Sequence, residues 1–317
     1  MTSYGYTLMT EQSGPRSLVA NAVEAEAAGF DFAVSSDHMN PWLQSQGHSP
    51  NAWPVLGAVA QATERLELMT YVTCPTMRYH PVVVAQLAST VALLSEGRFS
   101  LGLGAGENLN EHVVGQGWPS VGVRHEMFAE ALTIIKRLLA GETVDFAGQH
   151  FRVEAAKLWD VADPAPEIGV AVSGEKSLAI AREHADFLIA VEPDAELTGG
   201  VPATMKKVGQ VPICWDPDRD TAIARAHDQF RWFAGGWRVN ADLPTPQAFA
   251  AATQLITPEQ VADSIPCGPD LQPHVDAIRA FEQAGFTHVA VVQIGGNHQA
   301  SFLDWTEREL LPALRSA

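Results

Sequence analysis

Cysteine is scarce in this sequence. The 317 residues include only Cys74, Cys214 and Cys267, and no two of them have the CxxC spacing of zinc ribbons or thioredoxin-like redox motifs. A small secreted fold held together by disulfides is therefore excluded, because such folds need several cysteine pairs. The odd, scattered set is typical of a reduced cytoplasmic protein, in which each thiol serves as a small buried side chain.

Positive charge is also scarce. The chain has 20 Lys and Arg residues against 37 Asp and Glu residues, which gives a formal net charge of −17. Such a surface repels nucleic acid and anionic membranes, so we expect neither as a partner and expect a small-molecule substrate instead. An anionic ligand would need a local set of backbone N–H groups or a few cations.

Long hydrophobic runs are absent. Apolar runs such as residues 82–85 and 289–292 are short, whereas a membrane-spanning helix needs about 20 apolar residues. Residues 1–15 lack the basic and apolar regions of a secretory signal, which again favours a cytoplasmic protein. With 46% hydrophobic and 18% charged residues, the composition is that of a globular protein with a large core.

Strand and helix patterns alternate along the chain. Short apolar runs predict strands, and stretches with helical apolar spacing, often opened by proline and closed by glycine, predict helices. The predicted strands are residues 4–9, 30–35, 66–72, 99–103, 168–172, 187–191, 211–215 and 287–293. The predicted helices begin near residues 15, 49, 81, 124, 175, 221, 273 and 302.

This alternation predicts an α/β fold, a parallel (β/α)8 TIM barrel. We expect a single domain over residues 1–317, with insertions at about residues 141–166, which resembles a hairpin, and 235–268. An open doubly wound sheet is the main alternative. Such a sheet usually has a GxGxxG phosphate loop after its first strand, and the turn at residues 10–14, TEQSG, lacks one.

Chemically useful side chains follow two of the predicted strands. Asp37, His38 and Trp42 come after the second strand, and the glycine-rich segment 104–112, which contains Glu107, follows the fourth. In a TIM barrel the carboxyl ends of the strands meet at one mouth, where active sites lie. The sequence therefore predicts an active site with a histidine, a tryptophan and a carboxylate.

A metal site is one interpretation of these residues, since carboxylates and imidazoles are common ligands. Metal-dependent barrels generally take further ligands from later strand ends, but the fifth strand here ends in Val172-Ser173-Gly174. His184 is expected inside a helix, and His288 at the amino end of a strand. We therefore favour a site without a metal.

A cofactor site is the second interpretation. The backbone could approach a flat or phosphorylated ligand at Gly104, Gly106 and Gly174. Ser173 and Gly174 precede a predicted helix, where free N–H groups could face an anion, although the same residues are ordinary helix caps. Trp42, Trp53 and Trp118 could line an apolar pocket; for Trp53 and Trp118, packing of loops onto the barrel is an equally good explanation.

Five motifs carry a family resemblance. They are SDHMNPW at residues 36–42, QGHSP at 46–50, TCPTMRYHP at 73–81, GAGENLNEH at 104–112 and PCGPD at 266–270. Together they resemble the luciferase-like flavin and deazaflavin oxidoreductases, and among these the branch of glucose-6-phosphate dehydrogenases that use the deazaflavin coenzyme F420. The resemblance runs from Gly5 to about Leu314. It implies a TIM barrel, a homodimer and a coenzyme that lies across the mouth.

The resemblance also implies roles for individual residues. Asp37 and His38 match the pair beside the cofactor, Trp42 matches an active-site tryptophan, and Tyr71-Val72 matches a non-prolyl cis peptide behind the ring. Ring and side-chain contacts are implied for Ala105, Gly106, Glu107 and Asn110, and tail contacts for Ala171, Ser173 and Gly174, with Lys176 available to meet an anionic tail.

The implied chemistry is hydride transfer, with positioning and proton transfer supplied by the protein. His38 would take the hydroxyl proton as hydride leaves the adjacent carbon, because the pKa of histidine lies near the operating pH. Trp42 would hydrogen-bond the substrate oxygen, and Glu107 would protonate or charge-balance the reduced ring. A structural histidine bonded to Asp37 is the alternative for His38.

The substrate is expected to differ from a sugar phosphate. Relatives that bind a phosphosugar hold the phosphate with cations, whereas the matching positions here are Asp194 and, in the second insertion, Asp263. Arg231 or Arg238 could replace the missing cations. We expect a neutral alcohol, carbonyl or enone, in a pocket lined by Trp42, Trp53, Met77, Trp118 and Asp194.

Two other functions stay open. An FMN-dependent luciferase-like monooxygenase would retain FMN and consume oxygen. A non-catalytic flavin-binding barrel would keep the contacts to the ring but lose the proton-transfer residues, and the presence of His38 and Glu107 disfavours it.

Overall fold

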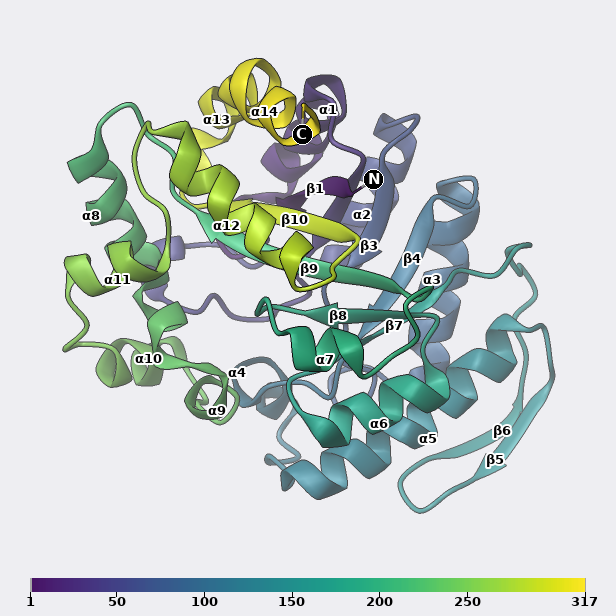
Figure 1. The fold of residues 1–317 in the computed structure, drawn as a ribbon. Coiled ribbons are helices and arrows are strands. Elements are labelled where there is room, and N and C mark those ends of the chain that lie inside the picture. The colour runs from purple at the N-terminus through teal and green to yellow at the C-terminus, as the bar shows by residue number, and fades with distance from the viewer. Residues whose placement is uncertain (1, 317) are drawn as a thin grey trace.

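A closed barrel of eight parallel strands forms the centre of the computed structural model, which describes residues 2–316 (Figure 1). The order around the barrel is β1-β10-β9-β8-β7-β4-β3-β2. The barrel strands are β1 (Ser3–Leu8), β2 (Phe32–Ser35), β3 (Glu67–Thr70), β4 (Phe99–Leu103), β7 (Ile168–Ala171), β8 (Phe187–Ala190), β9 (Lys206–Ile213) and β10 (His288–Gln293). The predicted TIM barrel is therefore confirmed.

Helices surround the barrel (Figure 1). The longer ones are α1 (Pro15–Ala28), α2 (Ala52–Ala62), α3 (Pro81–Leu94), α5 (Val121–Leu139), α6 (Glu175–His184), α8 (Arg219–Phe230) and α12 (Leu271–Gln283), and α13 (Gln299–Trp305) and α14 (Leu311–Arg315) end the fold beside α1. Pro15 and Pro81 occupy first helical turns, and Gly29 ends α1 with a φ of 96°. None of the helices in the described part of the chain has the length and apolarity needed to cross a membrane.

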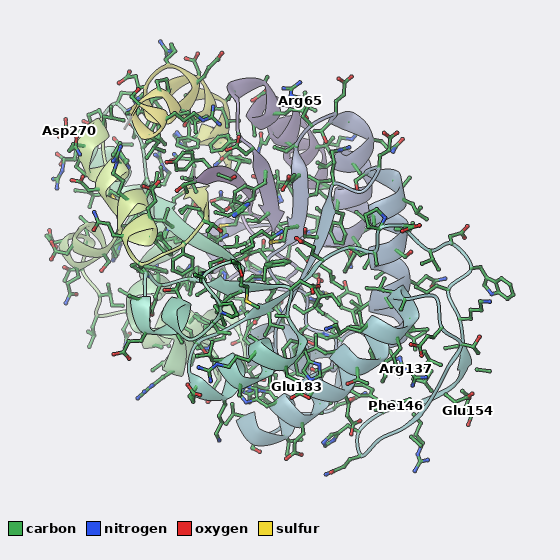
Figure 2. The ribbon with its side chains drawn as sticks, turned by 45° about the vertical axis from the view of Figure 1, so that its right-hand side comes forward. Arg65, Arg137, Phe146, Glu154, Glu183 and Asp270 are labelled. Carbon is green, nitrogen blue, oxygen red and sulfur yellow. The ribbon has the colours of Figure 1, made fainter. Side chains whose placement is uncertain are left out.

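The segment of the first predicted insertion forms a hairpin outside the barrel. Its strands, β5 (Val144–Ala147) and β6 (Arg152–Ala156), pair antiparallel. The carboxylate of Glu130 in α5 accepts hydrogen bonds of 2.7–3.0 Å from three backbone N–H groups of the hairpin loop. Figure 2 shows Arg137 of α5 together with Phe146 and Glu154 of the hairpin at one edge of the molecule.

Short helices fold the remaining loops at the mouth. They are α4 (Asn108–Glu111), α7 (Ala195–Gly199), α9 (Trp237–Asn240), α10 (Pro246–Ala252) and α11 (Pro258–Ser264). A hydrophobic cluster that includes Trp42, Leu109 and Phe249 joins α10 and α11 to the loops that follow β2 and β4. The second insertion therefore builds part of the mouth.

Two predicted elements differ most from the structure. β9 begins at Lys206 and not at residue 211, because the buried Lys207 donates its ammonium hydrogens to the carbonyls of Pro202 and Met205, which satisfies its charge inside the fold. The single helix predicted from residue 302 to 314 is interrupted by a π-helical segment, Thr306–Leu310.

The barrel interior is filled by apolar side chains. The cluster comprises Phe32, Val34, Met69, Tyr71, Phe187, Ile189, Val208 and Ala290. The large rings have room because glycines lie opposite them: a Cβ on Gly169 would lie 2.1 Å from the Phe187 ring. Val72 and Ala171 pack on this cluster and are only partly buried, so they form an apolar floor to the mouth.

Candidate active site

The candidate residues come from the carboxyl ends of four neighbouring strands. β1, β2, β3 and β4 are consecutive in the barrel. Glu11 follows β1, Asp37 and His38 follow β2, Thr73 follows β3, and Glu107 follows β4. Because these strands are parallel, all four loops open on the same mouth.

His38 lies between two carboxylates. Its Nδ1 is 2.6 Å from Oε1 of Glu11, and its Nε2 is 3.3 Å from Oε1 of Glu107. The Nδ1 contact is an ion contact without hydrogen-bond geometry. Glu11 is 1% exposed, and its other oxygen accepts a hydrogen bond of 2.6 Å from the Ser36 hydroxyl. The histidine is thus held from the buried side by Glu11 and from the mouth side by Glu107.

This pairing decides the charge of the histidine. Burial alone would lower the pKa of His38, but the negative charges of Glu11 and Glu107 outweigh burial and raise it to about 9. Burial opposes ionisation of Glu11 as well, yet the positive charge of His38 and the Ser36 hydroxyl hold its pKa below the usual range. At neutral pH the pair is an imidazolium beside a carboxylate.

Asp37 does not bind His38, so the alternative of a structural histidine bonded to Asp37 is not what the structure shows. Its carboxylate accepts from the Thr73 hydroxyl at 2.7 Å and from Nη2 of Arg78 at 3.1 Å. Arg78 also donates its backbone N–H to Glu111 at 3.0 Å. The Asp37 side chain therefore ties the loop after β2 to the loop after β3, and its partners are not His38.

Trp42 forms a wall beside His38. The two rings are 5.0 Å apart at an interplanar angle of 76°. Trp42 is also packed against Trp232, in the turn that follows α8, which stacks on it at 4.2 Å, and against Phe249 of the second insertion, whose ring lies edge-to-face with it at 5.2 Å. These contacts fix the orientation of the indole.

Asn110 links the two loops that carry His38 and Glu107. Its amide nitrogen donates to Oε1 of Glu107 at 2.5 Å, and its amide oxygen accepts from the backbone N–H groups of Met39 and Asn40 at 2.7 and 2.9 Å. The side chain is fully buried. Asn110 thus sets the position of Glu107 relative to His38.

The mouth has an apolar floor with glycines at its border. The Tyr71–Val72 peptide is cis, as the resemblance implied, and it presents Val72 beside Ala171. A Cβ on Gly104 would lie 2.7 Å from Cγ2 of Val72, and a Cβ on Gly106, whose φ is 80°, would lie 2.7 Å from Sγ of Cys74. A larger residue at Gly104 would displace Val72 of the floor, and one at Gly106 would displace Cys74 and Glu111 beside it.

The segment predicted to hold a coenzyme tail begins α6. Gly174 is the N-cap residue of this ten-residue helix and provides no side-chain cap. A Cβ at Gly174 would meet no atom within 4 Å, so there is open space beside the free N–H groups of the first turn. Ser173 and Lys176 are exposed at the same end. The residue types and the space suit an anionic group.

The other predicted substrate residues are spread over the mouth. Trp53 lies in α2, is 3% exposed and packs on Phe99, so it has no surface left for a substrate. Met77 is buried in the loop after β3. Trp118 donates to Asp242 at 2.8 Å and stacks under the guanidinium of Arg124. Trp118 is therefore occupied by packing and by its own hydrogen bond.

Asp194 and Asp263 are the two aspartates at the positions predicted to face a phosphate. Asp194 is the N-cap of α7 and accepts from the backbone N–H of Glu196 at 2.7 Å. Asp263 is exposed in α11. The carboxylate of Asp194 is thus fixed at the mouth end of β8.

An open pocket of about 740 Å³ adjoins these residues. It is lined by Asn40 and Pro41 of the loop after β2, by His48 and His112, and by residues 244–247. None of His38, Trp42 and Glu107 lines it. The pocket therefore borders the loop that carries the proposed chemistry and does not contain that chemistry. Within residues 2–316 no group of three or more His, Cys, Asp or Glu residues is arranged to hold a metal.

Sequence reasoning missed Glu11, Arg78 and Trp232. Glu11 had a usable signal, since it follows a strand end just as Asp37 does. Arg78 stood inside a recognised motif, but only the fold shows that it reaches Asp37. Trp232 had no signal, because its contact with Trp42 joins segments far apart in the sequence.

Comparison with known proteins places the chain in a family. The model of the luciferase-like monooxygenase family matches residues 2–288. The chain belongs to the luciferase-like monooxygenase family. An F420-dependent glucose-6-phosphate dehydrogenase of Beutenbergia cavernae is 34% identical, with 100% of this chain and 98% of that protein covered. An F420-dependent hydroxymycolic acid dehydrogenase of Mycobacterium tuberculosis is also 34% identical, with 98% and 88% covered.

One solved structure is similar over nearly the whole chain. An F420-dependent secondary alcohol dehydrogenase, solved with an F420-acetone adduct, has a TM-score of 0.89 and 28% sequence identity, and the match covers 99% of both chains. The monooxygenase RslO1 from Streptomyces bottropensis has a TM-score of 0.74 and 18% sequence identity, which shows a common fold.

Proposed function

We propose that this protein is an F420-dependent dehydrogenase that transfers hydride between the deazaflavin and a neutral alcohol, carbonyl or enone. The observation that carries the proposal is the imidazole of His38 between Glu11 and Glu107, at the mouth of a barrel. Relatives that match this chain over nearly its full length use F420.

The residues at the mouth suit a deazaflavin. Val72 and Ala171 give an apolar floor for a ring, and Glu107 and Asn110 give a polar border. The uncapped start of α6, with Lys176, offers N–H groups and a cation to an anionic tail. When bound there, F420 supplies a ring carbon that accepts or gives hydride.

The chain itself supplies the proton. In the reduction direction, the imidazolium of His38 donates a proton to the substrate oxygen; in the oxidation direction, the neutral imidazole accepts it. The Nε2 position serves this transfer, because Nδ1 is held at 2.6 Å by the buried Glu11 whereas the contact of Nε2 with Glu107 is 3.3 Å. Trp42 shields this position from water and limits the orientation of the substrate.

The pH dependence of the two directions is predicted to be opposite. Since His38 is protonated below a pKa of about 9, kcat/KM for carbonyl reduction should be constant near neutral pH and fall as the pH rises through about 9. Alcohol oxidation needs the neutral imidazole, so kcat/KM for oxidation should rise over the same pH range. Initial rates measured from pH 6 to about 10 with one alcohol–ketone pair test this.

Glu11→Gln tests whether Glu11 sets the pKa of His38. Loss of the nearer negative charge should lower the pKa of His38 by about 1–3 units, so both limbs move to lower pH. Glu126→Gln is the control, because Glu126 also contacts a histidine, His150, at 3.2 Å but contacts no member of the His38 cluster. Superimposable profiles of Glu11→Gln and the wild type would show that Glu11 does not set the ionisation.

Substrate choice is predicted from charge. A Lys or Arg contact to phosphate typically contributes ~1.5–3 kcal/mol, so without such cations kcat/KM for glucose-6-phosphate should lie at least ~10–100-fold below that for a neutral secondary alcohol. Asp194→Asn keeps the helix cap and removes the charge, and should raise kcat/KM for the phosphosugar alone. A wild-type preference for the phosphosugar would contradict the neutral substrate class and leave the coenzyme assignment intact.

We also propose that the chain is a single domain and forms a homodimer. A groove between α2 and α3 has apolar surface that a second copy could cover, provided by the exposed Leu94 and the half-buried Leu87. Sedimentation velocity gives the test: a dimer is expected, and a monomer at micromolar concentration would contradict the proposal.

A further inference from the structure

The motif PCGPD at residues 266–270 has no part in the proposed hydride chemistry. The structure places it beside the carboxyl end of β9, where Cys214 and Cys267 are partners in a parallel β-bridge. The N–H of Cys214 donates to the carbonyl of Pro266 at 2.9 Å, and the N–H of Gly268 donates to the carbonyl of Cys214 at 3.0 Å. The backbone on both sides of the pair is therefore fixed.

Both thiols are free and close enough to be joined. Paired strands lie about 4.8 Å apart, within the roughly 4.4–6.8 Å between Cα atoms that a disulfide spans. Each thiol donates only to a carbonyl, Cys214 to Ala222 and Cys267 to Ile265, both at 3.2 Å. Cys214 is fully buried and Cys267 is partly exposed, so a small oxidant reaches the pair from the Cys267 side.

A buried cation lies beside the pair. Arg225 donates to Asp216 at 2.7 Å and to the carbonyl of Trp215 at 2.8 Å, while its Nε has no hydrogen-bond partner among the described residues. The neighbouring Cys267 thiol and, against burial, Arg225 lower the pKa of the Cys214 thiol. Cys74 is the opposite case, because burial holds its pKa well above the usual value.

We propose that Cys214 and Cys267 form a reversible dithiol–disulfide site at the rim of the mouth, oxidised by a peroxide. The Cys214 thiol loses its proton, and its sulfur attacks the O–O bond of hydrogen peroxide; the hydroxide released takes up that proton as one water, and Cys214 becomes a sulfenic acid. The sulfur of Cys267 then forms the S–S bond and displaces the hydroxyl, which leaves with the Cys267 proton as a second water. The two thiols lose two electrons, and the peroxide gains them.

The site is connected to the proposed active site by a chain of contacts. Trp215 follows Cys214, and its backbone N–H and carbonyl bind the side chain of Gln293 at 3.0 and 2.9 Å. The carbonyl of Gln293 accepts from Gln12 at 2.7 Å, and Gln12 adjoins Glu11, the partner of His38. Drawing Cys214 toward Cys267 would shift this chain, so oxidation should reversibly lower kcat; this part rests on the proposed function.

The modification itself is tested without activity. The full-length protein is treated with hydrogen peroxide, blocked with an alkylating agent, and examined by intact mass and by non-reducing peptide mapping. We expect a mass loss of two hydrogens, a cross-link between the peptides of Cys214 and Cys267, and reversal by dithiothreitol. Cys267→Ser should abolish the cross-link, and Cys74→Ser, the control, should retain it.

Each outcome has a distinct meaning. Oxygen addition without a cross-link, or a cross-link that includes Cys74, would overturn the site. A 214–267 cross-link that leaves kcat unchanged would confirm the disulfide and overturn its link to catalysis. If peroxide treatment lowers the kcat of Cys267→Ser as much as that of the wild type, peroxide acts at another site. If no hydride transfer is found in any form, the peptide map alone still decides whether the disulfide forms.

Discussion

Replacing His38 with alanine is expected to lower kcat by ~100-fold or more, the usual scale for loss of a general acid–base group. Glu11 and Glu107 raise the pKa of His38, so its imidazole at the mouth carries a proton at neutral pH. The floor formed by Val72 and Ala171 is unchanged in this variant. The dissociation constant for F420, measured by fluorescence titration, should therefore stay close to the wild-type value while steady-state turnover collapses.

The matched control is His150→Ala. His150, in the loop of the β5–β6 hairpin, also contacts a glutamate at 3.2 Å, but that glutamate is Glu126 of the outer helix α5. Removal of His150 should leave kcat close to the wild-type value.

Glu107→Gln should lower kcat more than it weakens coenzyme binding, because the variant keeps the hydrogen bond from Asn110 and loses the negative charge. Turnover of His38→Ala within a few-fold of the wild type would assign the proton to another group.

Exchange of F420 for FMN is expected to abolish turnover. We expect oxidised F420 to bind with micromolar or tighter affinity and FMN to bind more weakly, because the full-length relatives use F420 and the mouth pairs an apolar floor with a proton-transfer histidine. Parallel titrations, with oxygen consumption recorded after reduction of each coenzyme, make the comparison. Tighter FMN binding with oxygen consumption would favour a monooxygenase.

The barrel could be predicted because its signals are local. Each strand is a short apolar run, and Pro15, Gly29 and Pro81 mark helix ends through backbone geometry that depends on one residue. The meeting of Asp37, His38 and Glu107 follows from topology, since parallel strands place their carboxyl ends together. Both inferences need only the pattern along the chain.

The partners within the site could not be predicted, because they depend on side-chain directions. His38 meets Glu11 and not Asp37, since Ser36 and Thr73 hold the two carboxylates in different places. Trp53 looked like a mouth residue but turns onto Phe99, because a large apolar ring gains more by burial in the layer between barrel and helices. The rings packed against Trp42 are Trp232, in the turn after α8, and Phe249, in the second insertion, whose short helices lack a long apolar period.

The most direct test of the account is transfer of deuterium. The protein is mixed with oxidised F420 and a neutral secondary alcohol that carries deuterium on its carbinol carbon, and the coenzyme is then analysed by mass spectrometry. We predict bleaching of the oxidised deazaflavin and deuterium on the reduced ring, with both processes slowed ~100-fold or more in His38→Ala. Unchanged F420 with a panel of neutral alcohols and ketones, in either direction, would contradict the proposed function.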